Sequence, residues 1–283
     1  MQRSTDRFLT THTGSLPRPD DLIRMMYAKE EGVPVEAAAL ERRIAQAVAE
    51  VVRKQADAGV DIINDGEMSK PSYATYIKDR LSGFGGADNS FVYQDLVGFP
   101  GLAKRVFGDP GRSRRRTPTC NAAVQVRDPQ AAQTDVAHLR AALASVQAAD
   151  GFLTAASPGV VSLFFRNEHY PTEEAYLFAI AEAMRQEYET ITGAGLVLQI
   201  DCPDLGMGRH TIFKAASDAA FLGHAEEQVE VNYKKTPRGV EMRRKIARLN
   251  GYLNESVHGM ILRYPAFIAF RFAVASSSDW PPE

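Results

Sequence analysis

The chain has 283 residues, of which 45% are hydrophobic and 24% charged, as is usual for globular proteins. Its 33 Lys and Arg against 35 Asp and Glu give a net charge of -2, so we expect neither nucleic acid nor a membrane as a partner. No apolar run approaches the roughly 18 residues of a membrane-spanning helix, and the N-terminus lacks the apolar core of a signal peptide. The two cysteines, Cys120 and Cys202, have no CxxC spacing, so we expect a cytoplasmic protein with reduced thiols.

The first half of the chain predicts a strand, a helix and a second strand. Residues 7–16 form a short β-prone run that ends at a turn containing Gly, Ser and Pro. A helix is predicted over 36–57, because apolar residues recur there at three- and four-residue steps, and Gly59 then ends it. The nearly continuous apolar run at 60–65 is typical of a strand buried on both faces, as in parallel sheets.

The same order returns further along the chain. Residues 151–165 predict another buried strand with its loop, and Thr172 is a candidate N-cap for a helix that continues to Ile191. Residues 196–201 then predict a third buried strand. This alternation indicates an α/β fold with a parallel sheet. Given the length, we expect a (β/α)8 barrel of the TIM type, with an open doubly wound sheet as the alternative.

Two regions fit this pattern less well. Residues 83–118 are rich in Gly, Pro and Arg and predict a long loop, in which Arg112 and residues 114–116 either meet an anionic substrate or lie in solvent. The chain after Val231 is first basic and then apolar and aromatic, without a βα rhythm. We therefore expect a partial barrel over residues 1–230 and an atypical tail over 231–283.

Three segments end an apolar strand on polar residues beside Gly or Pro: residues 13–15, 65–67 and 201–203. In a barrel such residues line the C-terminal mouth, where active sites lie, so they can converge despite their separation in sequence. Two carboxylates and a hydroxyl suit a ligand with an ammonium and a carboxylate group. The same acids could instead form an acid–base pair, bind a metal or cap helices.

Three further side chains are candidates to line the same mouth. His12 lies in the first segment, Cys202 in the third, and His210 shortly after the third. A structural role is the alternative for each histidine. Cys202 has no adjacent base that would activate its thiol.

The three motifs together resemble the cobalamin-independent methionine synthase family, in its catalytic-domain and methionine synthase II-like form. They read THTGSLPRP (11–19), GVDIINDGEMSK (59–70) and LQIDCPDLGMGRH (198–210), and the resemblance runs from about residue 5 to 225. It implies a (β/α)8 barrel that transfers a methyl group from a methylated folate to the thiol of homocysteine. It also implies that Gly14 and Ser15 hold the homocysteine carboxylate and that Glu67 and Asp201 hold its amino group.

The chain departs from this family after the third motif. The family activates the thiol on zinc, held by a His-x-Cys pair, a Glu and a further Cys that all follow this motif, whereas no cysteine follows Cys202 here. We therefore expect zinc from the family but assign no metal ligand and no catalytic residue. Residues 226–283 are too few for three further βα units, so we expect a barrel that is incomplete at its C-terminal end, from a truncated or misread product or a diverged relative.

Several functions stay open on the sequence alone. The first is a methyltransferase of the methionine synthase type, which we expect to be inactive in the chain as written. Within the superfamily, the alternatives are a thiol alkyltransferase with another acceptor, since Cys202 replaces the family's usual Glu, and a uroporphyrinogen decarboxylase-like lyase. The remaining alternative is a non-catalytic remnant that binds a small amino acid.

Overall fold

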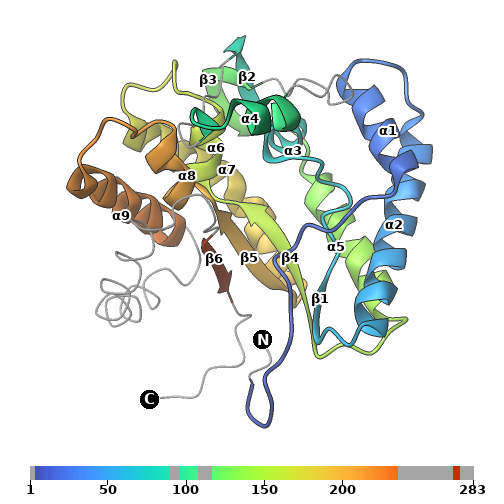
Figure 1. The fold of residues 1–283 in the computed structure, drawn as a ribbon. Helices are drawn as coiled ribbons and strands as arrows, with labels where there is room; N and C mark the ends of the chain where they lie inside the picture. The colour runs from blue at the N-terminus through green and yellow to red at the C-terminus, as the bar shows by residue number, and fades with distance from the viewer. Residues whose placement is uncertain (1–3, 89–95, 108–116, 235–269, 275–283) are drawn as a thin grey trace.

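The computed structural model describes residues 4–88, 96–107, 117–234 and 270–274 (Figure 1). The described elements are α1 (Asp20–Glu30), α2 (Ala37–Asp57), β1 (Ile62–Asn64), α3 (Tyr73–Arg80), β2 (Leu81–Asp88), α4 (Pro100–Phe107), β3 (Pro118–Val126), α5 (Gln130–Leu143), β4 (Asp150–Ala156), α6 (Pro158–Phe164), α7 (Glu173–Gly193), β5 (Val197–Cys202), α8 (Asp204–His210), α9 (Asp218–Lys234) and β6 (Phe270–Val274). None of these described helices is long and apolar enough to cross a membrane.

The main sheet has the strand order β1-β4-β5-β6. β1 pairs with β4 and β4 with β5, both in parallel, with Ile63 opposite Gly151 and Phe152 opposite Val197. The helices α2, α5 and α7 lie side by side along this sheet and cover β1, β4 and β5 (Figure 1). Consecutive parallel strands with an outer layer of helices are the arrangement of a (β/α) barrel, so the predicted α/β class is confirmed.

The helices begin where their capping residues predict. The Thr172 side chain accepts a hydrogen bond from Ala175 N at 3.1 Å and starts α7, and the Glu36 side chain accepts one from Ala38 N and starts α2. The apolar stripe of α2 is buried against β1 and α5. The predictions of strands at 60–65, within 151–165 and at 196–201, and of helices from 36 and 172, are therefore confirmed.

The prediction of a strand over residues 7–16 is wrong. Asp61 N and Ile62 N both donate to Thr10 O, at 3.1 and 3.0 Å, but no strand forms there. The Asp61 carboxylate accepts the hydrogen bond of Thr10 N at 2.7 Å, so a side chain takes the place of the next backbone partner. The N-terminal segment therefore lies along the edge of β1 in an extended form without joining the sheet.

The prediction of one long loop over residues 83–118 is also wrong in part. β2 and β3 form an antiparallel hairpin, interrupted by register shifts, and α4 lies between them in sequence. Gly83 has φ +103°, and a Cβ there would lie 2.8 Å from Ala122 O of the facing strand. Gly83 therefore lets β2 and β3 approach each other closely and does not form part of a loop. Arg112 and residues 114–116 lie outside the described residues.

The C-terminal part adds one strand to the sheet. β6 runs antiparallel to β5, with Cys202 opposite Phe270, so it is not the next parallel strand of a complete barrel. Among the described residues the barrel is incomplete at this end. The division of the chain at residue 230 falls within α9 and stays a prediction.

Candidate functional site

A cavity of about 230 Å³ lies at the C-terminal ends of β1 and β4. Its lining side chains come from the N-terminal loop, the loop after β1, α3 and the end of β4, and those that matter below are Ser15, Arg18, Glu67, Lys70, Tyr73 and Thr154. This is the end of a barrel sheet at which active sites are built. Its size is below the roughly 300–1,000 Å³ of pockets for drug-sized ligands, which suits a small molecule.

The first two predicted segments are tied directly to each other. Leu16 N donates to Gly66 O at 3.1 Å, and Arg18 Nη2 donates to the backbone oxygens of Glu67 and Lys70 at 2.6 and 2.5 Å. Ser15 is exposed at the cavity wall beside them. The structure therefore brings the loop that contains Ser15 against the loop that contains Glu67.

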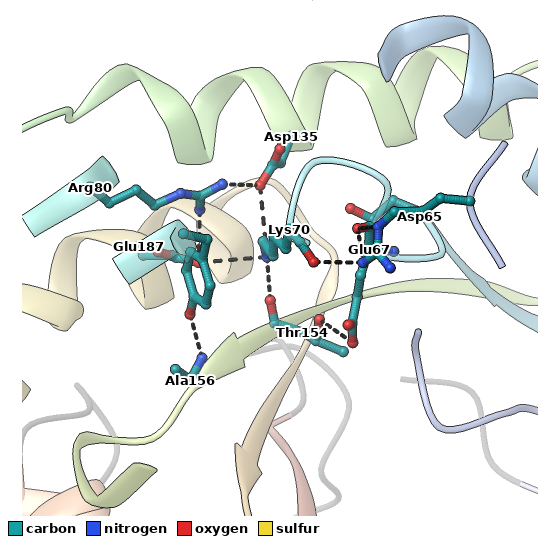
Figure 2. Close-up of polar contacts among 10 residues, drawn as sticks. Asp65, Glu67, Lys70, Arg80, Asp135, Thr154, Ala156 and Glu187 are labelled. Carbon is teal, nitrogen blue, oxygen red and sulfur yellow. Dashed lines mark hydrogen bonds and ion pairs between the residues drawn. The ribbon is translucent and has the colours of Figure 1, made fainter. Parts of the chain in front are cut away.

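Glu67 is held in an unusual backbone conformation. Its φ is +58°, and it is the one non-glycine residue with positive φ in the described part of the chain. Glu67 N donates to Asp65 Oδ1 at 2.9 Å, and Thr154 Oγ1 donates to Glu67 Oε1 at 3.0 Å (Figure 2). Such backbone strain persists where neighbouring contacts fix it, and it is concentrated at functional sites.

Asp201 joins the same group of loops from β5. Tyr73 donates its hydroxyl to Asp201 Oδ2 at 2.8 Å, and Gln199 Nε2 donates to Asp201 Oδ1 at 3.0 Å and to Thr13 O at 3.1 Å. Because Tyr73 lines the cavity, its hydroxyl links the buried Asp201 carboxylate to the cavity wall. The three predicted segments are thus connected by hydrogen bonds through their neighbours Leu16, Tyr73 and Gln199.

A buried cluster of charges lies directly beneath the cavity. Arg80 Nη2 donates to Asp135 Oδ2 at 2.5 Å, and Arg80 Nη1 lies 3.0 Å from Glu187 Oε1 (Figure 2). Lys70 Nζ lies 3.7 Å from Asp135 Oδ2 and 3.6 Å from Glu187 Oε1. Burial raises the pKa of Asp65 to about 6, against the lowering effect of Lys70.

The three further candidates lie in different surroundings. His12 is within 2.7 Å of Gln55 Oε1 through its Nε2 atom, packs on Phe152, and does not line the cavity. Cys202 is buried, and burial raises the pKa of its thiol well above the usual value. His210 ends α8, and its side chain lies outside the described residues.

Among the described residues, no set of side chains fits the zinc that the resemblance implies. No group of three or more His, Cys, Asp or Glu side chains in the described ranges is placed to hold a metal ion. Zinc binds thiolates, whereas burial raises the thiol pKa of both Cys120 and Cys202.

Several residues of the site were missed from the sequence. Lys70 stands three residues after Glu67 within the second motif, and Tyr73 follows three residues later, so their proximity to Glu67 could have been noticed. Thr154 lies within a run of small and apolar residues and gives no local signal. Arg80 and its acidic partners Asp135 and Glu187 are charged residues on helices, and from sequence such residues are expected on a solvent-exposed helix face.

Known proteins similar to this chain agree with the motifs. The sequence model of the family described as "Cobalamin-independent synthase, Catalytic domain" matches residues 8–243. The chain is 29% identical over 195 residues to a methionine synthase of Sulfolobus acidocaldarius, covering 69% of this chain and 51% of that protein. It is 26% identical over 198 residues to a methionine synthase of Saccharolobus solfataricus, covering 69% and 53%. The chain thus spans about half the length of the curated relatives it matches.

A solved structure is also similar. It is that of a B12-independent methionine synthase from Shewanella sp. W3-18-1 in complex with selenomethionine, with a TM-score of 0.50 at 17% identity over 70% of this chain and 50% of that one. At this identity the likeness shows the fold, a TIM barrel, of which the described strands form part. With a family match over residues 8–243, the chain belongs to the cobalamin-independent synthase family and corresponds to its catalytic domain.

Proposed function

We propose that the chain is a methyltransferase of the cobalamin-independent methionine synthase type, which transfers a methyl group from a methylated folate to the thiol of homocysteine. Its family supports this, and the single observation that carries it is one cavity that Ser15 and Glu67 line together with Tyr73, whose hydroxyl is hydrogen-bonded to Asp201. Homocysteine and the folate are then its small-molecule partners. The two free cysteines fit a cytoplasmic location.

The proposed ligand contacts follow from charge. The ammonium group of the amino acid pairs with the Glu67 carboxylate at the cavity wall, and the buried Asp201 carboxylate attracts it through the hydroxyl of Tyr73. The ligand's carboxylate lies at Ser15, which offers its hydroxyl and backbone N–H, while the buried backbone of Gly14 (φ +118°) shapes the turn. A zwitterion is thereby oriented at both ends.

Activation of the thiol is a separate requirement. In the proposed reaction zinc would supply it by lowering the thiol pKa, but the described side chains do not make a zinc donor set. The described residues therefore account for holding and orienting the amino acid, and no step is assigned to a metal. This observation favours one second candidate, an amino-acid-binding protein without methyl transfer.

The test separates binding from chemistry. Calorimetry with L-methionine and L-homocysteine measures the first, and methionine formation from homocysteine and methyltetrahydrofolate with added zinc measures the second. Binding with turnover supports the methyltransferase, and binding without turnover supports the second candidate. Absence of both overturns the proposal.

Truncated ligands test the assigned contacts. Glu67→Gln should weaken L-methionine binding about tenfold or more, the value of one charge-assisted hydrogen bond, and leave 4-(methylthio)butanoate, which lacks the amino group, unaffected. Glu31→Gln, an identical change at an exposed position, is the matched control. Equal weakening of both ligands would contradict the assignment of Glu67 to the amino group.

A further inference from the structure

Lys70 is a buried cation at the floor of the cavity. Only 5% of its side chain is exposed, and its Nζ donates to Thr154 O at 2.5 Å. The same Nζ lies 5.4 Å from the centre of the Tyr76 ring and faces the carboxylates of Asp135 and Glu187 (Figure 2). A buried ammonium group is costly unless it is paired, and here every neighbour named is an acceptor or a π face.

Thr154 connects this cation to Glu67. Its backbone oxygen accepts the hydrogen bond of Lys70 Nζ, while its hydroxyl donates to Glu67 Oε1 at 3.0 Å. Arg18 adds a second connection, because its guanidinium binds the backbone oxygens of both Glu67 and Lys70. The position of the Glu67 carboxylate therefore depends on the strand end that Lys70 holds.

Asp65 places an additional charge in the same cluster. Lys70 and Arg80 are two cations facing three buried carboxylates, those of Asp65, Asp135 and Glu187. Three charges act on Asp65: those of Glu67 and Lys70 from its own loop, and that of Asp135 from α5. Arg80 on α3 and Glu187 on α7 complete the cluster. The pKa of Asp65 is raised to about 6, chiefly by burial, with Lys70 acting to lower it and the charges of Asp135 and Glu67 acting to raise it.

We propose that Lys70 is a positioning residue, which holds Glu67 through Thr154 for the amino group of the ligand. This rests on the proposed amino-acid binding. An ammonium group bound at Glu67 is attracted by ionised Asp65, so affinity rises with pH as Asp65 loses its proton to the buffer. The pH at the midpoint of this rise in affinity depends on the charge of Lys70, because that charge lowers the pKa of Asp65.

The test is calorimetric titration of L-methionine across the range in which Asp65 ionises, with a midpoint near pH 6 expected for the unaltered chain. Lys70→Met should weaken binding about tenfold and move the midpoint upward, because the cation that lowers the pKa of Asp65 is lost. Thr154→Val should weaken binding with the midpoint unchanged. Thr154→Ser, which keeps the hydroxyl, is its matched control.

A charge-balanced variant separates positioning from folding. Lys70→Met combined with Glu187→Gln leaves Arg80 paired with Asp135, and Glu187→Gln alone is its control. The double variant should fold, judged by circular dichroism, and still show weak binding and the raised midpoint. If the unaltered chain does not bind L-methionine, the proposed function itself fails. If it binds and the folded variants match it in affinity and midpoint, only the role of Lys70 is refuted.

Discussion

Asp204 makes the stability of the fold depend on pH. It follows β5 at the start of α8, is 7% exposed, and accepts a hydrogen bond from Ser157 Oγ at 2.7 Å through Oδ1. Its Oδ2 and Gln228 Oε1 are buried oxygens without a hydrogen-bond donor in the described part of the chain. Burial raises the pKa of Asp204 from 3.8 to about 6, and Ser157 opposes this only partly.

The size and sign of the effect follow from that shift. A rise of about two pKa units corresponds to about 3 kcal/mol at 1.36 kcal/mol per unit. Because the folded-state pKa is raised, this stabilisation is present in full below the unfolded-state value of 3.8 and is lost as pH rises through about 6. Above that pH the fold carries an ionised buried carboxylate.

Asp204→Asn removes this titration while keeping an oxygen acceptor for Ser157. Its free energy of unfolding, relative to the unaltered chain, should rise by about 2 kcal/mol between pH 4 and pH 7, since part of the about 3 kcal/mol is already lost at pH 4; urea unfolding followed by circular dichroism measures it. Asp57→Asn, at an exposed position, is the matched control and should show no such rise. Stability curves of Asp204→Asn and the unaltered chain that stay parallel over this range would refute the reasoning.

Three other outcomes are expected. Arg80→Met should lower the free energy of unfolding by about 3–5 kcal/mol, because the buried carboxylates of Asp135 and Glu187 lose their shared cation. Adding Glu187→Gln should restore part of this stability, and an unchanged urea midpoint for Arg80→Met would contradict the reasoning. Gly66→Ala should destabilise by about 1–2 kcal/mol or more in thermal melting, since φ is +65° and the new Cβ would lie 2.7 Å from Met68 Cε. Both cysteine thiols are buried with raised pKa values, so they should react with a thiol reagent only on unfolding; fast labelling of the native chain would argue against their burial.

The elements that could be predicted from sequence are those fixed by local pattern. The buried strands predicted at 60–65, within 151–165 and at 196–201 are short apolar runs, and the helix from Thr172 begins at its own cap. The hairpin could not be predicted in this way. The Gly-rich run that includes Gly83 has the sequence pattern of a loop. It forms a strand because it pairs with β3, whose facing residues are more than 30 positions away in sequence.

The residues of the site likewise divide into those that a local sequence pattern indicates and those that only the folded structure brings together. Ser15, Glu67 and Asp201 could be selected because each stands at the end of an apolar run, and strand ends of a parallel sheet meet at one edge. The run before Ser15 forms no strand but lies along β1, which brings Ser15 to the same edge. Their connecting partners could not, because Tyr73 reaches Asp201 over 128 positions in sequence and Thr154 reaches Glu67 over 87. Contacts of that range depend on the packing of the whole fold rather than on any local pattern.

The central claim is that the loops of Ser15, Glu67 and Asp201 form one site for a zwitterionic amino acid. A crystal structure of the chain with L-methionine tests it most directly. The account predicts the amino nitrogen within hydrogen-bonding distance of the Glu67 carboxylate and beside the Tyr73 hydroxyl that binds Asp201, with the ligand carboxylate at the hydroxyl and backbone N–H of Ser15. A ligand bound elsewhere, or bound in this cavity with its two ends reversed, would contradict it.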